Sequence, residues 1–205
     1  MKFKLVLCNL IICFFLFNCN ENVDRLITFD ENFEYSLEEF SDIEILRYDI
    51  PGWNNLTLKE QKLVYYLTQA GLSGRDIMWD QNYRHNLEIR MALQNVYFNY
   101  TGDKKSDDWM SFEVYLKRLW FSNGIHHHYS NDKIKPEFEL NYLTKILSST
   151  NTTISNDALD VIFNDLDSKK VNIAKGIDNV LLSAVNFYGP NVTSKDVYDF
   201  YSKVK

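Results

Sequence analysis

Residues 107–121, DDWMSFEVYLKRLWF, decide the fold class of this chain. Large apolar side chains recur in this stretch at steps of three and four residues, which is the spacing of one face of an α-helix. The members of this stripe are Trp109, Phe112, Leu116, Leu119 and Trp120. The stretch opens with two aspartates, and a helix dipole favours negative charge at that end. We therefore expect an amphipathic helix whose aromatic residues serve the core rather than a binding platform.

Helix signals of the same kind occur on both sides of this stretch. Thr57, with Glu60 three residues later, predicts a capping box at the start of a helix. Further helices are predicted at about residues 82–100, 136–147, 156–163, 177–187 and 193–203. Pro136 is expected as the first residue of its helix, and Gly102 is expected to cap a helix C-terminus.

Ahead of these helices the chain is expected to be extended. Residues 42–50 alternate in part between apolar and polar side chains, as a strand does, and Pro51-Gly52 ends the alternation. Residues 122–135 are predicted as a polar loop, and 148–155 as a Ser/Thr/Asn-rich surface loop that could join two subdomains. The predicted fold class is mainly α, with a short extended or β segment near the start.

The composition is that of an ordinary folded protein, and its net charge argues against one class of binding partner. The chain has 205 residues, which allows one domain or two small ones. Its formal net charge is −6. Because the sequence has no basic stripe that could neutralise phosphates, we expect no nucleic-acid partner.

The first 18 residues, MKFKLVLCNLIICFFLFN, predict a secretory signal peptide. Lys2 and Lys4 precede a nearly unbroken apolar run from Leu5 to Phe17, which is the layout of such signals. The run is too short to span the hydrocarbon core of a bilayer as a helix. The alternatives are an uncleaved anchor and a buried hydrophobic helix.

Cys19 follows this leader and is the candidate attachment point for a lipid. Residues 16–19, Leu-Phe-Asn-Cys, resemble the cleavage site of bacterial lipoproteins, in which the peptidase cuts before the cysteine. The resemblance implies a lipoprotein of the bacterial cell envelope, held to the membrane by a lipid on Cys19; otherwise the chain is secreted or periplasmic. All three cysteines lie within the first 19 residues, so the rest of the chain has neither a disulfide framework nor a cysteine zinc site.

Candidate catalytic and metal-binding groups are sparse. On an extended backbone His126 and His128 could share one face while His127 points away, which gives a metal two ligands and no third. His85 and Glu88 form a His-x-x-Glu step, but residue 89 is Ile, so the inverted zinc-peptidase motif is absent. The sequence also contains no His-Glu-x-x-His. It also lacks a Gly-x-Ser-x-Gly motif and a phosphate-binding glycine loop. We therefore assign no catalytic and no metal-ligating residue.

Residues 56–138 resemble part of the dipeptidyl-peptidase III family, especially its bacterial lipoprotein-type members. Three stretches carry the resemblance: LTLKEQKLVYYLTQAGLSGRDIMWDQN (56–82), HNLEIRMALQNVYFNYTGDK (85–104) and EVYLKRLWFSNGIHHHYSNDKIKPEF (113–138). The third is the most specific, with its Trp-Phe-Ser-Asn-Gly followed by Ile-His-His-His-Tyr. Residues 183–203 are compatible with the next part of the same family.

The resemblance implies a zinc-dependent exopeptidase that releases dipeptides from peptide N-termini and has two lobes around a cleft. The family's zinc motif, His-Glu-x-x-Gly-His, is absent from this sequence. Zinc is thus expected in the complete family enzyme and not in this chain. The domain organisation expected from the resemblance is a signal peptide (1–18), a tether and lead-in segment (19–40) and an incomplete N-terminal portion of the non-zinc lobe (41–205).

The resemblance also implies a peptide-facing loop. Asn123, His126, His128 and Tyr129 are expected to help bind peptide, because their side chains can bond a peptide backbone; the alternative is that the loop only shapes the lobe. The chain is therefore expected to be an N-terminal fragment or truncated relative of such an enzyme, inactive alone, or one part of a split enzyme. The alternative is a non-catalytic peptide-binding or structural lipoprotein of the cell envelope.

Overall fold

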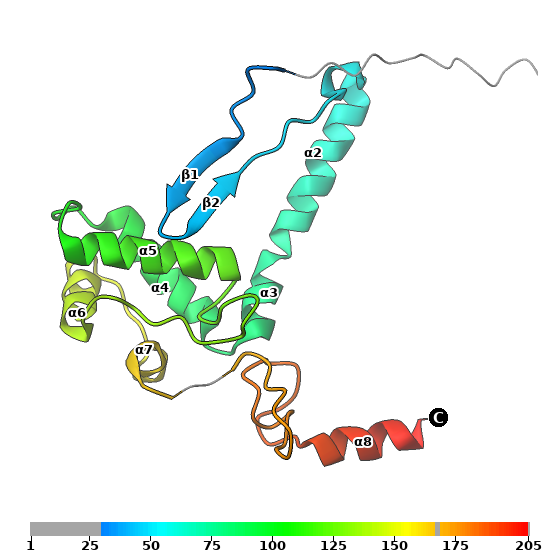
Figure 1. Cartoon of the computed structure of the whole chain (residues 1–205), viewed down its shortest axis with the longest axis vertical. Helices are drawn as coiled ribbons and strands as arrows, with labels where there is room; N and C mark the ends of the chain where they lie inside the picture. Colours follow the sequence, from blue (N-terminus) through cyan, green and yellow to red (C-terminus); the bar gives the residue numbers. More distant parts are fainter. Residues whose placement is uncertain (1–29, 167–168, 205) are drawn as a thin grey trace, which may run out of the picture.

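The computed structural model describes residues 30–166 and 169–204 and is mainly helical, with one short sheet. The predicted signal peptide and Cys19 lie outside the described residues. The strands are β1 (Ser36–Phe40) and β2 (Ile43–Leu46), followed by a short 3-10 helix, Trp53–Asn55. The α-helices are α2 (Leu58–Ser73), α3 (Arg75–Asn82), α4 (Asn86–Asn99), α5 (Asp107–Ser122), α6 (Leu140–Ser149), α7 (Asn156–Phe163) and α8 (Ser194–Lys203) (Figure 1).

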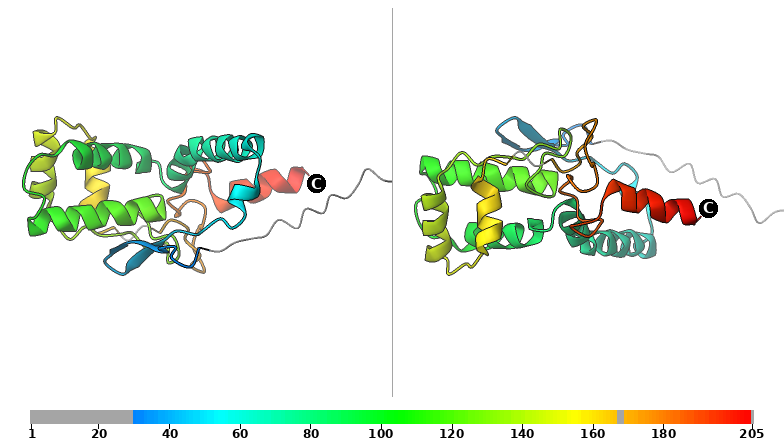
Figure 2. Two further views of the ribbon diagram at one scale, coloured as in Figure 1. Left: turned by 90° about the horizontal axis from the view of Figure 1, so that it is seen from above. Right: turned by 90° about the horizontal axis from the view of Figure 1, so that it is seen from below.

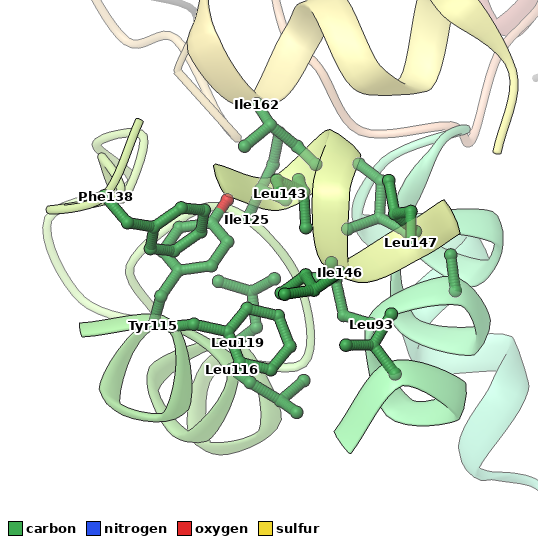
Figure 3. Packing of buried hydrophobic residues seen from close by; sticks show 14 of the residues in the cluster. Leu93, Tyr115, Leu116, Leu119, Ile125, Phe138, Leu143, Ile146, Leu147 and Ile162 are labelled. Carbon is green, nitrogen blue, oxygen red and sulfur yellow. The ribbon is translucent and has the colours of Figure 1, made fainter. Parts of the chain in front are cut away.

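The hydrophobic core lies among α4, α5, α6 and α7. Figure 2 shows α4 and α5 running along two sides of this unit, with α6 and α7 crossing between them. Four members of the stripe predicted in residues 107–121 are buried: Trp109, Phe112, Leu116 and Leu119. Figure 3 shows Leu143 and Ile146 of α6 pointing into the same cluster as Leu93 of α4. The amphipathic helix and its core role are thus confirmed.

A two-stranded antiparallel hairpin precedes α2 and lies against the outer side of α5. Phe40 pairs with Ile43, and Ser41 between them adopts a left-handed conformation with φ of 53°. Lys117 and Arg118 of α5 reach the hairpin, with Lys117 Nζ 2.5 Å from a Glu38 carboxylate oxygen. The extended segment predicted near residues 42–50 is confirmed for β2, whereas β1 lies in the stretch predicted to be a tether.

Helix α2 begins as predicted but packs little. The backbone N–H of Thr57 donates to Glu60 Oε2 at 2.7 Å, and Thr57 Oγ1 accepts from the N–H of Glu60, which completes the capping box. None of the sixteen residues of α2, all within the described part, is buried. The helix extends away from the unit formed by α4 to α7 (Figure 1). It therefore exposes apolar side chains that a helix at a core would bury.

Two shorter helices were also predicted with nearly correct bounds. α7 occupies residues 156–163, as expected, and Ser155 caps it by accepting from the N–H of Ala158. α8 begins at Ser194 behind a capping box made by Thr193 and Asp196. Such caps depend on residues within a few positions of the helix start, so they can be predicted from the local sequence.

The prediction that Pro136 starts a helix is wrong. The chain stays non-helical until Leu140, and this brings Phe138 into the core with 5% of its surface exposed. Its ring centroid lies 5.8 Å from that of Phe112 and 5.6 Å from that of Tyr115. Burying a phenylalanine stabilises by about 1.5–3 kcal/mol, which outweighs the preference of proline for a helix start.

The cap assigned to Gly102 is also wrong. α4 ends at Asn99, and the next residue, Tyr100, is extended and stacks on Trp109 with 4.7 Å between ring centroids. A Cβ on Gly102 would lie 2.3 Å from the Tyr100 hydroxyl oxygen. Glycine is thus required here for the close approach of a side chain and not for a helix end.

The helix predicted over residues 177–187 is absent, and turns occupy this described stretch instead. The Asp178 carboxylate accepts from the backbone N–H groups of Leu181 and Ser194, at 3.0 Å each. These contacts hold the pKa of Asp178 below its usual value, with the Leu181 N–H as the largest cause. Such side-chain-to-backbone bonds offer the chain an alternative to the helix.

The burial of α6 predicts that Leu143→Ala destabilises the protein. Leu143 is fully buried, so its truncation leaves a cavity in the core and should lower the free energy of unfolding by about 2–5 kcal/mol in urea denaturation. Leu63→Ala is the matched control, because Leu63 is 58% exposed on α2 and its loss should change stability by less than about 0.5 kcal/mol. Equal effects of the two variants would contradict this assignment of the core.

Candidate functional site

The candidate peptide-binding loop begins where α5 ends, at Asn123. This residue takes the left-handed conformation, with φ of 53° and ψ of 44°, and its N–H donates to the carbonyl of Leu119. Its own carbonyl accepts from Asn82 Nδ2 at 3.0 Å. The backbone of Asn123 is therefore fixed by two elements, whereas its half-buried side chain lines a hollow described below.

The loop is then locked to the junction of α3 and α4 by Asn86, which is fully buried. Asn86 Nδ2 donates to the carbonyl of Trp79 at 3.1 Å, and Asn86 Oδ1 accepts from the N–H of Ile125 at 3.1 Å. Gly124 lies over this amide with φ of 147°, and a Cβ there would approach Asn86 Nδ2 to 2.2 Å. No local sequence pattern predicts this contact, because it joins residues far apart along the chain.

His126 lies in the interior and not on the surface of the loop. It has 1% of its surface exposed, pairs with Lys133 in an antiparallel bridge, and lies 5.4 Å from the Tyr83 ring centroid. Lys133 is buried too, and its Nζ donates to the carbonyl of Asn164 at 2.5 Å. Burial lowers the pKa of Lys133. The segment predicted as a polar loop thus contributes to the core through its first residues.

His127 organises a turn and does not point freely away. Its Nδ1 accepts from the backbone N–H groups of Tyr129 and Ser130, at 3.2 and 3.1 Å. Asp132, on the returning segment, accepts from the N–H of His127 through its carbonyl at 2.7 Å, and its carboxylate pairs with Lys169. The C-terminal segment is thereby attached to the loop.

His128 and Tyr129 are the exposed residues of the loop. The His128 ring lies 4.9 Å from that of Phe121, and Tyr129 is 84% exposed. Desolvation, followed by the charges of His127 and Lys170, lowers the pKa of His128. Because the chain turns over residues 128–130, His126 and His128 do not share a face.

The four predicted residues therefore do not form one constellation. Asn123 lines one hollow of about 420 Å³, whereas His126 is buried and Tyr129 is exposed. A second hollow, of about 340 Å³, is lined by His127, which is not one of the four. The first hollow also brings together side chains that the sequence analysis missed, among them Arg75, Trp79 and Arg90. They come from two helices, and no sequence motif marks them.

The described residues offer no zinc site of the kind that the resemblance attributes to the complete enzyme. Within residues 30–166 and 169–204, no three His, Cys, Asp or Glu side chains are placed to hold a metal ion together. The donor set therefore does not fit the family's zinc, and we derive no chemical step through that metal. In the same part of the chain, no helix combines the length and the apolar character needed to cross a bilayer.

Comparison with known proteins gives no match for this chain, either among protein-family models or among curated protein sequences.

The contacts of Asn86 predict a large effect of a small substitution. Asn86→Ala removes the partner of the buried Ile125 N–H, while the Trp79 carbonyl keeps only the N–H of Tyr83, so the free energy of unfolding should fall by about 1–3 kcal/mol. Asn95→Ala is the matched control, because Asn95 is exposed, with its side-chain amide donating to the Thr152 hydroxyl and accepting from Asn99 Nδ2; water can replace both bonds, so the loss of stability should be less than about 1 kcal/mol. Thermal denaturation of both variants measures the difference, and an effect of Asn86→Ala no larger than the control would contradict the anchoring role.

Proposed function

We propose that this chain is the N-terminal portion, or a truncated relative, of a dipeptidyl-peptidase III-like zinc exopeptidase. In this proposal it supplies part of the non-zinc lobe of a two-lobed enzyme and part of its peptide-binding surface. It has no peptidase activity alone, because the residues that hold zinc and activate water belong to the other lobe. The proposal starts from the resemblance of residues 56–138.

The observation that carries the proposal is the uncovered apolar surface of α2. Its exposed members include Leu63, Tyr66 and Leu67, with 58%, 67% and 62% of their surface accessible. A contiguous apolar surface of this kind marks a site where more protein packs. Since α2 lies within the stretch that resembles the family, we propose that further residues of a larger lobe pack against its apolar surface.

The end of the described chain supports the same proposal. α8 exposes Tyr198, Phe200 and Tyr201, with 74%, 62% and 58% of their surface accessible. A polar helix would need no cover, whereas this one carries three aromatic side chains within about one turn, residues 198–201. Both helices thus have surfaces suited to burial in a larger fold.

The loop at residues 123–129 is the part of the proposal that concerns substrate. Of its candidate residues, Asn123, His128 and Tyr129 are accessible to a ligand, whereas the buried His126 would act by fixing the loop. We further propose that the leader 1–18 is removed and that Cys19 carries a lipid, which would place the chain at a bacterial cell envelope. The mass of the mature N-terminus tests this last step.

The coding DNA that follows Lys205 tests the proposal of a larger enzyme. We expect a continuation, in the same frame or displaced by a frameshift, that encodes His-Glu-x-x-Gly-His. As the activity control, the chain alone with added zinc should release no dipeptide from a dipeptidyl-naphthylamide substrate. A stop followed by an unrelated gene would contradict the fragment and favour the alternative, a peptide-binding or structural lipoprotein.

A further inference from the structure

A hollow of about 420 Å³ lies between α3, α4 and the end of α5, at the edge of the buried core to which Trp79 belongs. Its lining residues are Arg75, Trp79, Arg90, Gln94, Trp120 and Asn123. The lining holds two guanidinium groups, two indoles and two amides, and no carboxylate. An arginine and a tryptophan can only donate hydrogen bonds, so the hollow is rich in donors and poor in acceptors.

Two of these donors are buried without a protein acceptor. Among the described residues, neither the indole N–H of Trp79 nor the Nε–H of Arg90 has a hydrogen-bond partner. Trp79 as a whole has 1% of its surface exposed. A buried donor without an acceptor is costly, and such groups call for an explanation when they occur together.

The guanidinium of Arg90 is held in place by contacts that leave its Nε–H without an acceptor among the described residues. One terminal nitrogen lies 2.7 Å from an Asp76 carboxylate oxygen, and the central carbon lies 5.2 Å from the Trp79 ring centroid. Asp76 is largely exposed and does not line the hollow. Arg75, which also lines the hollow, is exposed and adds a second positive charge.

We propose that this hollow binds the carboxylate of a short peptide. A carboxylate is planar and has two oxygens, which matches the fork of a guanidinium and leaves lone pairs for an indole N–H. Trp120, which also lines the hollow, provides apolar contact for the carbon atoms beside the carboxylate. Because Asp76 already balances the charge of Arg90, only the charge of Arg75 is uncompensated, which suits a singly charged carboxylate better than a doubly charged phosphate. The carboxylate site stands by itself, whereas the peptide as its source rests on the proposed function.

Indole N–H resonances in proton–nitrogen NMR spectra of the chain test the site directly. We expect tri-alanine and acetate to shift the Trp79 indole resonance in a saturable way, while tri-alanine amide, which lacks the carboxylate, leaves it unchanged. Arg75→Gln should weaken tri-alanine binding about tenfold or more, because it removes a charged donor. Arg90→Gln should weaken it further. Arg84→Gln is the matched control, because Arg84 lines a different hollow, and it should leave binding unchanged.

Each outcome decides a separate part of the proposal. Equal shifts with tri-alanine and its amide, no shift with any ligand, or a shift with inorganic phosphate alone would overturn the carboxylate site. A shift with acetate but not with tri-alanine would keep the site and overturn the peptide as its source. If Arg90→Gln does not fold, the exposed Arg75→Gln still decides. The DNA after Lys205 is an independent measurement, so failure of the site and failure of the proposed function are distinguishable.

Discussion

The rest of the structure depends on the burial of one face of α5. Phe112, Leu116 and Leu119 are fully buried there, in a core cluster to which α4, α6 and α7 also contribute. The opposite face of the same helix holds the hairpin, since Lys117 and Arg118 pair with carboxylates of the β1–β2 region. The end of the helix then sets the start of the candidate loop. A change in how α5 packs would therefore move both the hairpin and the loop.

Asn86 connects the packed core to the part of the surface where we propose that ligands bind. It ties the first residues of the loop to the end of α3, so the loop and the hollow lined by Trp79 and Arg90 share one support. The pattern differs at α2, where no described residue of the helix is buried. The chain thus combines a well-packed centre with an apolar helix that has little to pack against.

The sequence was sufficient to predict features that depend on residues close together along the chain. The stripe of α5, the capping box at Thr57 and the start of α8 are all encoded within a few positions, so periodicity and caps were sufficient. Features that depend on distant contacts were missed. Pro136 was outweighed by the burial of Phe138, and the interior position of His126 requires knowledge of Lys133 and Tyr83. The donor-rich hollow arises only where α3, α4 and α5 meet, which no local pattern reveals.

Residue-resolved amide hydrogen exchange tests most directly whether the core around α5 is stably packed while α2 lacks a packing partner. We predict the slowest exchange in α5, at amides such as Leu116 and Leu119, because opening there requires the core to come apart. Amides in the middle of α2 should exchange at least about a hundredfold faster, because little buried surface holds that helix in place. Equal protection of α2 and α5 in the chain alone would contradict this view, since α2 would then need no further partner.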